Sequence, residues 1–297
     1  MRNSKKKLFL VLFFFLSIIF AFHAQASNLG LDKSKIRLSI PPEGSEAGEI
    51  KIDNFSDETL KVKVYLEDWV YKNTYDGQKN FFFKGTQPLS CSEWISFSSS
   101  ELTLPPFGKQ SVNYVVRVPA QAKGGHYSVM FFETSIGKYN QEASEETEER
   151  SVGINVAVRI GALFYVEVKD TIKKEAEVSN LAVSGNTGGN PLLISLDLKN
   201  IGNVDITTTP YFHIMDQQGM VYARAEFNEV YTMPGDAAKV TASWTKPISQ
   251  GVYDLVMTFN LNQAQDAAGA RRGPAMIKET RIEIGRDGRI ERTGELK

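Results

Sequence analysis

The chain has 297 residues, a formal net charge of −1 and one cysteine. A nearly neutral chain offers no basic footprint for nucleic acid or an anionic membrane, and a single cysteine excludes an internal disulfide. The hydrophobic cores must therefore hold without such links, and we expect Cys91, beside Trp94 and Ile95, to be a buried small hydrophobe.

The first 26 residues have the three regions of a secretory signal peptide. Basic residues precede an apolar run from Leu8 to about Phe22, and small residues follow at Ala24 and Ala26. The run is shorter than the roughly 20 residues of a membrane-spanning helix, so we expect cleavage after Ala26. Because the signal holds four cations and no carboxylates, the mature chain has a net charge near −5. We expect it to be periplasmic or otherwise exported, with no membrane span.

Short runs of alternating apolar and polar residues follow the signal, separated by turn residues. In the first half of the chain these runs predict about seven strands, at 35–40, 48–53, 60–71, 93–97, 110–118, 126–134 and 152–168. Side chains along a strand point alternately to opposite faces. This spacing, with almost no helical period, indicates an immunoglobulin-like β-sandwich.

A second series of runs predicts strands within 178–185, 191–200, 210–227, 237–244, 251–262 and 276–285, and a turn at 216–219 divides the third run into two strands. The charged stretch 169–175 has neither period and marks a domain junction. We therefore predict an all-β protein with two immunoglobulin-like β-sandwich domains. The expected divisions are a signal peptide at 1–26, a first sandwich at 27–170, a second at 171–285, and a loose polar tail at 286–297.

The strand predicted at 152–168 is longer than the usual strand of about 3 to 10 residues. Its even positions are apolar, so one face is committed to apolar packing. An open edge of this length invites self-association unless a partner covers it. The alternative is that the strand bends between two sheets at Gly161 and is covered by the protein's own domains.

Two further segments have more than one interpretation. Residues 137–150 are polar with five glutamates and form either a cation site or docking loop, or a solvated connection. Because they lack the spacing of a calcium loop, we expect the solvated connection. The triplet from Phe81 to Phe83 lies in an insertion, where it forms either an exposed apolar patch or local packing.

No motif for catalysis or metal binding occurs in the sequence. The two histidines of the mature chain, His126 and His213, lie in separate predicted strands. Neither a zinc-binding helix motif, a paired cysteine motif, a nucleophile elbow nor a phosphate-binding loop is found. We therefore expect no enzymatic activity, no cofactor and no metal site.

Several segments of the first domain, in order, resemble the periplasmic PapD-type pilus-assembly chaperones. The segment KIRLSI resembles the first strand of that family, and Arg37 falls on its arginine. VYLEDWVYKNTYDG resembles the family's tyrosine-to-tryptophan strand with an insertion, and WISFSSSELTLPPFGKQSVNYVVRVP resembles the segment that follows. ALFYVEV resembles the close of the family's long seventh strand. The resemblance covers about residues 35–168.

The resemblance implies that the long strand lends apolar side chains to an incomplete subunit of a pilus or other surface assembly by β-strand addition. It assigns partner binding to Arg37, Val152, Ile154, Val156, Val158 and Ile160. Self-association through the 152–160 edge is a further expectation. The family also anchors its client's terminal carboxylate with a lysine, where this chain has Ala162. The nearest cation, Arg159, is expected on the opposite face.

The second sandwich is also similar to the second domain of two-sandwich bacterial cell-surface proteins that interact with WxL proteins. The leading hypothesis is therefore a non-enzymatic, exported chaperone of the pilus-assembly type. The alternative is a structural or adhesive cell-envelope protein that binds wall polymer or surface proteins.

Overall fold

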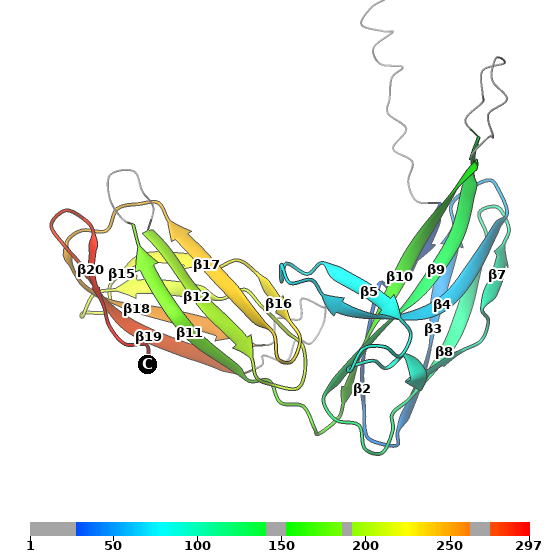
Figure 1. Ribbon diagram of the computed structural model, residues 1–297, viewed down its shortest axis with the longest axis horizontal. Coiled ribbons are helices and arrows are strands. Elements are labelled where there is room, and N and C mark those ends of the chain that lie inside the picture. Colours follow the sequence, from blue (N-terminus) through cyan, green and yellow to red (C-terminus); the bar gives the residue numbers. More distant parts are fainter. Residues whose placement is uncertain (1–27, 141–152, 186–191, 262–273) are drawn as a thin grey trace, which may run out of the picture.

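The structure, a computed structural model, describes residues 28–140, 153–185, 192–261 and 274–297. The described chain forms two immunoglobulin-like β-sandwich domains that lie end to end at an angle (Figure 1). The fold class predicted from the strand spacing is confirmed. Burial alternates along most strands, as in β2 (Lys35–Ile40), because one face of each sheet packs on a core.

The first domain is built from two sheets. Sheet A has the order β1 (Leu29–Leu31), β3 (Ser45–Asn54), β8 (Lys109–Arg117), β6 (Ile95–Phe97). Sheet B has the order β2 (Lys35–Ile40), β10 (Gly153–Val168), β9 (Gly125–Asn140), β4 (Leu60–Tyr71), β5 (Lys79–Phe83), and β7 (Glu101–Leu104) also pairs with β4. The strand predicted from residue 93 is replaced at its start by a 3₁₀ turn at Ser92–Trp94.

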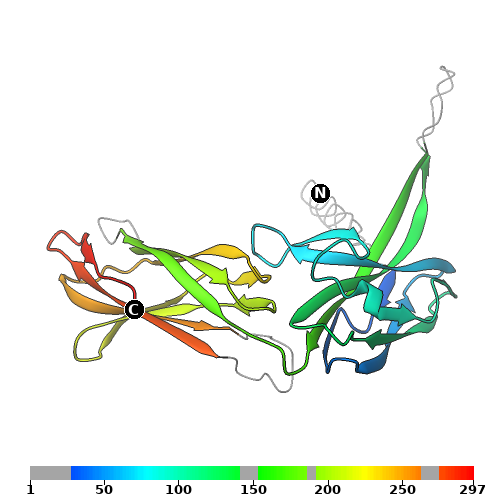
Figure 2. The same ribbon diagram turned by 60° about the horizontal axis from the view of Figure 1, so that its bottom comes forward.

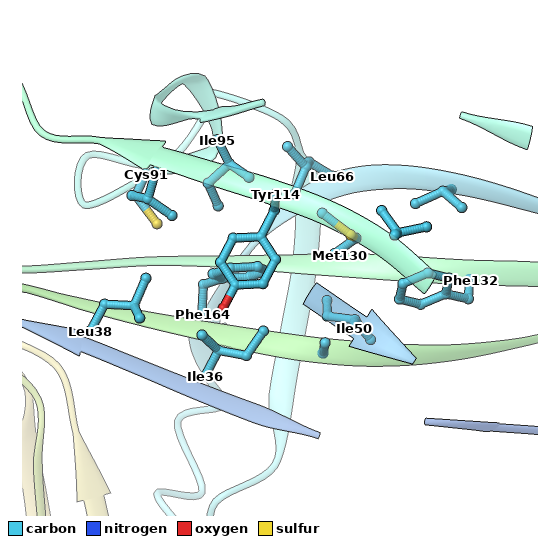
Figure 3. Close-up of a cluster of buried hydrophobic side chains, with 14 of the residues drawn as sticks. Ile36, Leu38, Ile50, Leu66, Cys91, Ile95, Tyr114, Met130, Phe132 and Phe164 are labelled. Atoms are coloured by element: carbon cyan, nitrogen blue, oxygen red, sulfur yellow. The ribbon is translucent and has the colours of Figure 1, made fainter. Parts of the chain in front are cut away.

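The core of the first domain lies between sheets A and B (Figure 3). Tyr114 of β8 meets Phe164 of β10 edge to face, with ring centroids 5.0 Å apart. Cys91 is fully buried in this core, as predicted, and burial raises the pKa of its thiol well above the ordinary value. Sheet B thus has one face on the core and an outer face turned away from sheet A.

The second domain has three groups of strands around its own core. Sheet C contains β11 (Ala176–Ser184), β12 (Leu192–Asn200) and β17 (Ala237–Trp244), and β13 (Ile206–Thr208) pairs with β16 (Val230–Thr232). Sheet E has the order β15 (Val221–Glu226), β14 (Tyr211–Met215), β18 (Gly251–Asn260), β19 (Ala275–Ile284), β20 (Ile290–Thr293). Strand β20 corrects the expectation of a loose tail, because it pairs with β19 and Lys297 is hydrogen-bonded to Glu279.

The two domains contact each other at two places. Near the linker between β10 and β11, Tyr127 of β9 is hydrogen-bonded to Asp205 of the second domain. At the other place the turn of the β4–β5 hairpin reaches the second domain, where the Tyr231 amide donates to the Tyr75 carbonyl (Figure 2). The residue limits of the domains stay predictions, and the predicted cleavage site lies outside the described residues.

Candidate functional site

Half of one edge of β10 is open. The strand pairs antiparallel with β9 from Gly153 to Glu167, whereas β2 pairs with it, in parallel, only from Leu163 to Val168. In the described part of the chain, no strand pairs with the β2 side of residues 153–162. The strand stays in sheet B on both sides of Gly161, so the alternative of a bend between two sheets is wrong. Coverage by the second domain, which was part of the same alternative, is not seen in the described strands either.

The core-facing side of β10 changes from exposed to buried along the strand. Val156 is 43% exposed and Val158 is half-buried, while Ile160 packs against the edge of the core. From Ala162 onward the same face is fully buried. In Figure 2 the β9–β10 hairpin, in green, projects beyond the rest of its domain. The apolar side chains of its first half therefore extend past the core that they would otherwise join.

Two of the residues predicted to bind a partner cannot be placed with the others. Val152 lies outside the described residues, and for Ile154 only the backbone pairing with Tyr139 is described. The structure brings Val156, Val158 and Ile160 together on one face, and their role in partner binding stays a prediction.

Backbone hydrogen bonds show which amides of β10 face the open edge. The amides of Leu163 and Lys169 donate toward β2, to Ser34 and Ile40, whereas the amide of Val168 donates to Gly124 on the β9 side. Because this direction alternates along a strand, odd-numbered residues of β10 present their amide and carbonyl groups to the β2 side. Ala157, Arg159 and Gly161 therefore present these groups to the open edge.

A β-bulge lies in β9 opposite the open segment. Val156 is paired with Gly137 and Ala157 with Ser135, so Ile136 is the extra residue. The sequence predicted that β9 ends at Thr134, but the strand continues to Asn140, and the rest of the expected loop lies outside the described residues. A bulge increases the local twist of a strand pair, which helps to turn the hairpin away from the sandwich.

Arg159 lies on the outer face of β10, as expected. Its Nη1 is 2.9 Å from Glu67 Oε1 and donates to the Tyr65 hydroxyl at 3.3 Å, and its guanidinium lies 4.1 Å from the centre of the Phe131 ring. Beside it, Phe81 of β5 packs edge to face on Phe131. These contacts attach the open half of β10 to β4 across the intervening strand.

The phenylalanine triplet divides between the two interpretations. Phe81 packs on Phe131 but is still 38% exposed, Phe82 is 37% exposed, and Phe83 at the end of β5 is 85% exposed. Local packing and an exposed apolar surface therefore occur in the same short strand.

Arg37 lies away from the open segment, close to the contact between the domains. Its guanidinium is 4.1 Å from the centre of the Tyr165 ring on β10. Nearby, the carboxyl of Asp205 is buried; burial raises its pKa, and the positive charges of Arg37 and Lys174 oppose that rise. The structure thus places Arg37 in a mixed aromatic and charged cluster rather than beside Val156.

Sequence reasoning missed a second cation in this cluster. Lys79 of β5 lies 5.3 Å from the centre of the Trp69 ring and 5.2 Å from that of Tyr71, and burial lowers its pKa. The place of Lys79 in this cluster could not be predicted, because the sequence of the β4–β5 hairpin is interpreted as an insertion. Ala162, at which the resemblance places the lysine of the family, is buried.

Two other kinds of feature, a metal site and a membrane-spanning helix, are not found among the described residues. In the described ranges, no three His, Cys, Asp or Glu side chains gather as metal ligands would. None of the helices among the described residues is long and apolar enough to cross a bilayer.

Comparisons with known proteins give matches among solved structures only. No family model matches the chain, and no curated protein matches it. The class 5 fimbriae chaperone CfaA is 13% identical, with a TM-score of 0.47 over 84% of this chain and 97% of that chain. The E. coli chaperone DraB is 10% identical, with a TM-score of 0.40 over 84% and 94%. Among solved structures the chain resembles PapD-like fimbrial chaperones.

A further match is a chaperone–tip adhesion subunit pre-assembly complex, CsuC–CsuE, from the archaic pili of Acinetobacter baumannii. The matched chain is 10% identical, with a TM-score of 0.39 over 84% of this chain and 98% of that chain.

Proposed function

We propose that this chain is a non-enzymatic, exported chaperone of the pilus-assembly type that holds a partner subunit by β-strand addition to residues 153–162 of β10. The observation that supports this function is the open edge, whose core-facing side chains, including Val156, project beyond their own core. An added strand gains backbone hydrogen bonds, and pockets for alternate side chains give specificity.

The open edge also explains why a partner is needed. An edge strand with unpaired amides and carbonyls and an apolar face is a template for aggregation. In the described residues, neither β2 nor any strand of the second domain pairs with this open segment. A partner strand in line with β2 would continue the pairing that begins at Leu163.

The partner's chemistry follows from the two faces of β10. On the core-facing side, Val158 and Ile160 would contact apolar side chains of the partner, as expected for a protein subunit whose own sheet is incomplete. Arg37 is assigned to the end of the bound segment, where a guanidinium suits a carboxylate. Its support is its place on β2, beside the paired half of β10.

Labelled peptides of about ten residues, with valine at alternate positions, test the proposal by fluorescence anisotropy. We expect the double variant Val156→Thr and Val158→Thr to weaken binding roughly tenfold, because two methyl groups are lost from the contact. The matched control is Val221→Thr with Val252→Thr, which changes two exposed valines of the second domain and should bind normally. A peptide N-methylated at consecutive backbone amides should not bind, because neither of its edges can then donate hydrogen bonds to β10.

Equal binding by the two double variants would contradict the proposed site. Failure of every peptide to bind at millimolar concentration would overturn strand addition. Retention of the protein by cell-wall material would then favour the alternative of a structural or adhesive envelope protein.

A further inference from the structure

The outer face of sheet B carries a row of side chains with alternating charge. In the register of sheet B, Arg159 of β10 lies opposite Glu133 of β9, Glu133 lies opposite Lys63 of β4, and Lys63 lies opposite Glu101 of β7. A surface groove is lined by Lys63, Glu101, Glu133 and Ala157. Opposite charges that face each other across neighbouring strands stabilise a sheet, whereas like charges destabilise it.

A second row, beside the first, is aromatic. In the same register, Gly161 of β10 lies opposite Phe131 of β9, and Phe131 lies opposite Tyr65 of β4. The ring centroids of Phe131 and Tyr65 are 5.8 Å apart. A Cβ atom on Gly161 would lie 2.7 Å from Val129 Cγ2 and 3.0 Å from Phe131 Cε1. The glycine therefore lets these side chains fill the surface of the strand where its own side chain would stand.

Both rows end at the open edge. Arg159 and Gly161 lie in the part of β10 that lacks a partner on the β2 side. The Arg159 side chain stays 39% exposed although it forms an ion pair with Glu67. A strand added here places one outward side chain beside Arg159 and the next outward one, two residues away, beside Gly161. These two positions extend the charged row and the aromatic row.

We propose that the outward face of the partner strand carries an acidic side chain beside Arg159 and a large apolar or aromatic side chain beside Gly161. The acid continues the alternation of charge, and the large side chain covers the glycine and contacts the edge of the Phe131 ring. This inference rests on the proposed function, because it describes the strand bound at that edge. It makes Arg159 a specificity-determining residue.

The order of the two side chains depends on the direction of the bound strand. A strand parallel to β10 meets Arg159 before Gly161, so its sequence reads acid, any residue, aromatic. An antiparallel strand reads in the reverse order. The same two positions also fix the register, because a slip by one residue would turn both side chains to the opposite face.

The experiment uses the valine peptides described above on the full mature chain. The side chains between the valines, which face outward, are serine except at two positions. Those two positions carry Glu and Phe in one peptide, Lys and Phe in a second, and Glu and Ser in a third. Each peptide is also made with its two residues exchanged. We expect one order of the two residues to bind more tightly than the other. In that order, the Glu peptide should bind at least about twofold more tightly than the Lys peptide, and the Phe peptide about two- to tenfold more tightly than the Ser peptide. The preference for Glu should shrink at high salt, because the contact is partly exposed.

Variants of Arg159 connect the preference to this residue. Arg159→Gln should bind the Glu and Lys peptides equally, and Arg159→Glu should favour Lys. Lys63→Gln, at the far side of the same row, is the matched control and should keep the preference for Glu. Circular dichroism confirms that each variant is folded before binding is compared.

The outcomes separate the two proposals. Peptides that bind, and lose binding on N-methylation, but show no difference between Glu and Lys would overturn this inference and leave strand addition in place. A preference for Glu that persists in Arg159→Gln would also overturn it. Absence of binding by every peptide would overturn strand addition and this inference together.

Discussion

The Tyr127 hydroxyl and Asp205 bind each other twice across the contact between the two domains. The hydroxyl accepts a hydrogen bond from the Asp205 amide at 2.6 Å and donates to Asp205 Oδ1 at 3.1 Å. Both side chains are buried. Around them, Trp69, Tyr165 and Met233 form an apolar cluster to which both domains contribute. This pair therefore couples the base of β9, the strand behind the open edge, to the second domain.

Replacement of Tyr127 by Phe is expected to loosen this coupling. It leaves a buried carboxyl and a buried amide without their partner, which lowers the free energy of unfolding by about 1–3 kcal/mol. Urea unfolding followed by tryptophan fluorescence measures the loss. The control is Tyr253→Phe, which removes a hydroxyl bond to Ser249 inside the second domain. Only Tyr127→Phe should separate the unfolding transitions of the two domains, and identical behaviour of the two variants would contradict the coupling.

Amide hydrogen exchange should alternate along the open half of β10. Ala157, Arg159 and Gly161 direct their amides to the open edge and should exchange fast, whereas Val158 and Ile160 direct theirs to β9 and should exchange slowly. NMR-detected exchange on the isolated mature chain resolves these residues. Bound valine peptide should slow the three odd-numbered amides selectively. Uniform protection without peptide would show that the edge is covered, and would count against strand addition.

The stability of the first domain should depend on pH through His126. Its ring lies 4.2 Å from that of Trp94, and burial lowers its pKa from the ordinary 6.5. Since the unfolded chain takes up the proton more readily, the free energy of unfolding falls as pH drops below about 6.5 and through the lowered pKa. His126→Gln should remove this part of the fall.

Urea unfolding at about pH 7.5 and about pH 5 compares the variant with the parent chain. His213→Gln is the control, because burial also lowers the pKa of His213, but that residue belongs to the second domain. An unchanged difference between the two pH values in His126→Gln would contradict the assignment.

Arg37 is expected to distinguish peptides by their ends. If it holds the carboxylate of a bound segment, Arg37→Gln should weaken peptides with a free C-terminus about tenfold and leave C-terminally amidated peptides unchanged. Lys51→Gln, which removes a cation from sheet A, is the control. Equal effects on both kinds of peptide would show that Arg37 stabilises the cluster around Tyr165 without contacting the partner.

Strong alternation made much of the fold predictable. The runs predicted at 35–40 and 60–71 have the same limits as β2 and β4, because one face of each strand packs on a core. Strands of three residues, such as β1, are too short to show a period. The extension of β9 to Asn140 was missed because its last residues are polar.

Less of the candidate site could be predicted, because it depends on which strands are neighbours. Alternation showed that Val156, Val158 and Ile160 share a face, but not that the pairing of β2 with β10 begins only at Leu163 and leaves them at an open edge. The cluster around Arg37 joins segments far apart in sequence, including Lys79 and Asp205. No local pattern records such contacts.

The parallel pairing of β2 with β10 has a consequence for how the first domain forms. It joins Ile36 of β2 to Phe164, in the last strand of the same domain. Contacts between residues so distant in sequence form slowly, because a long loop must close first. In the export that we propose, a chain that emerges from its N-terminus therefore keeps β2 without this neighbour until almost the whole domain has crossed. Export and completion of the sandwich are expected to be separate events in time.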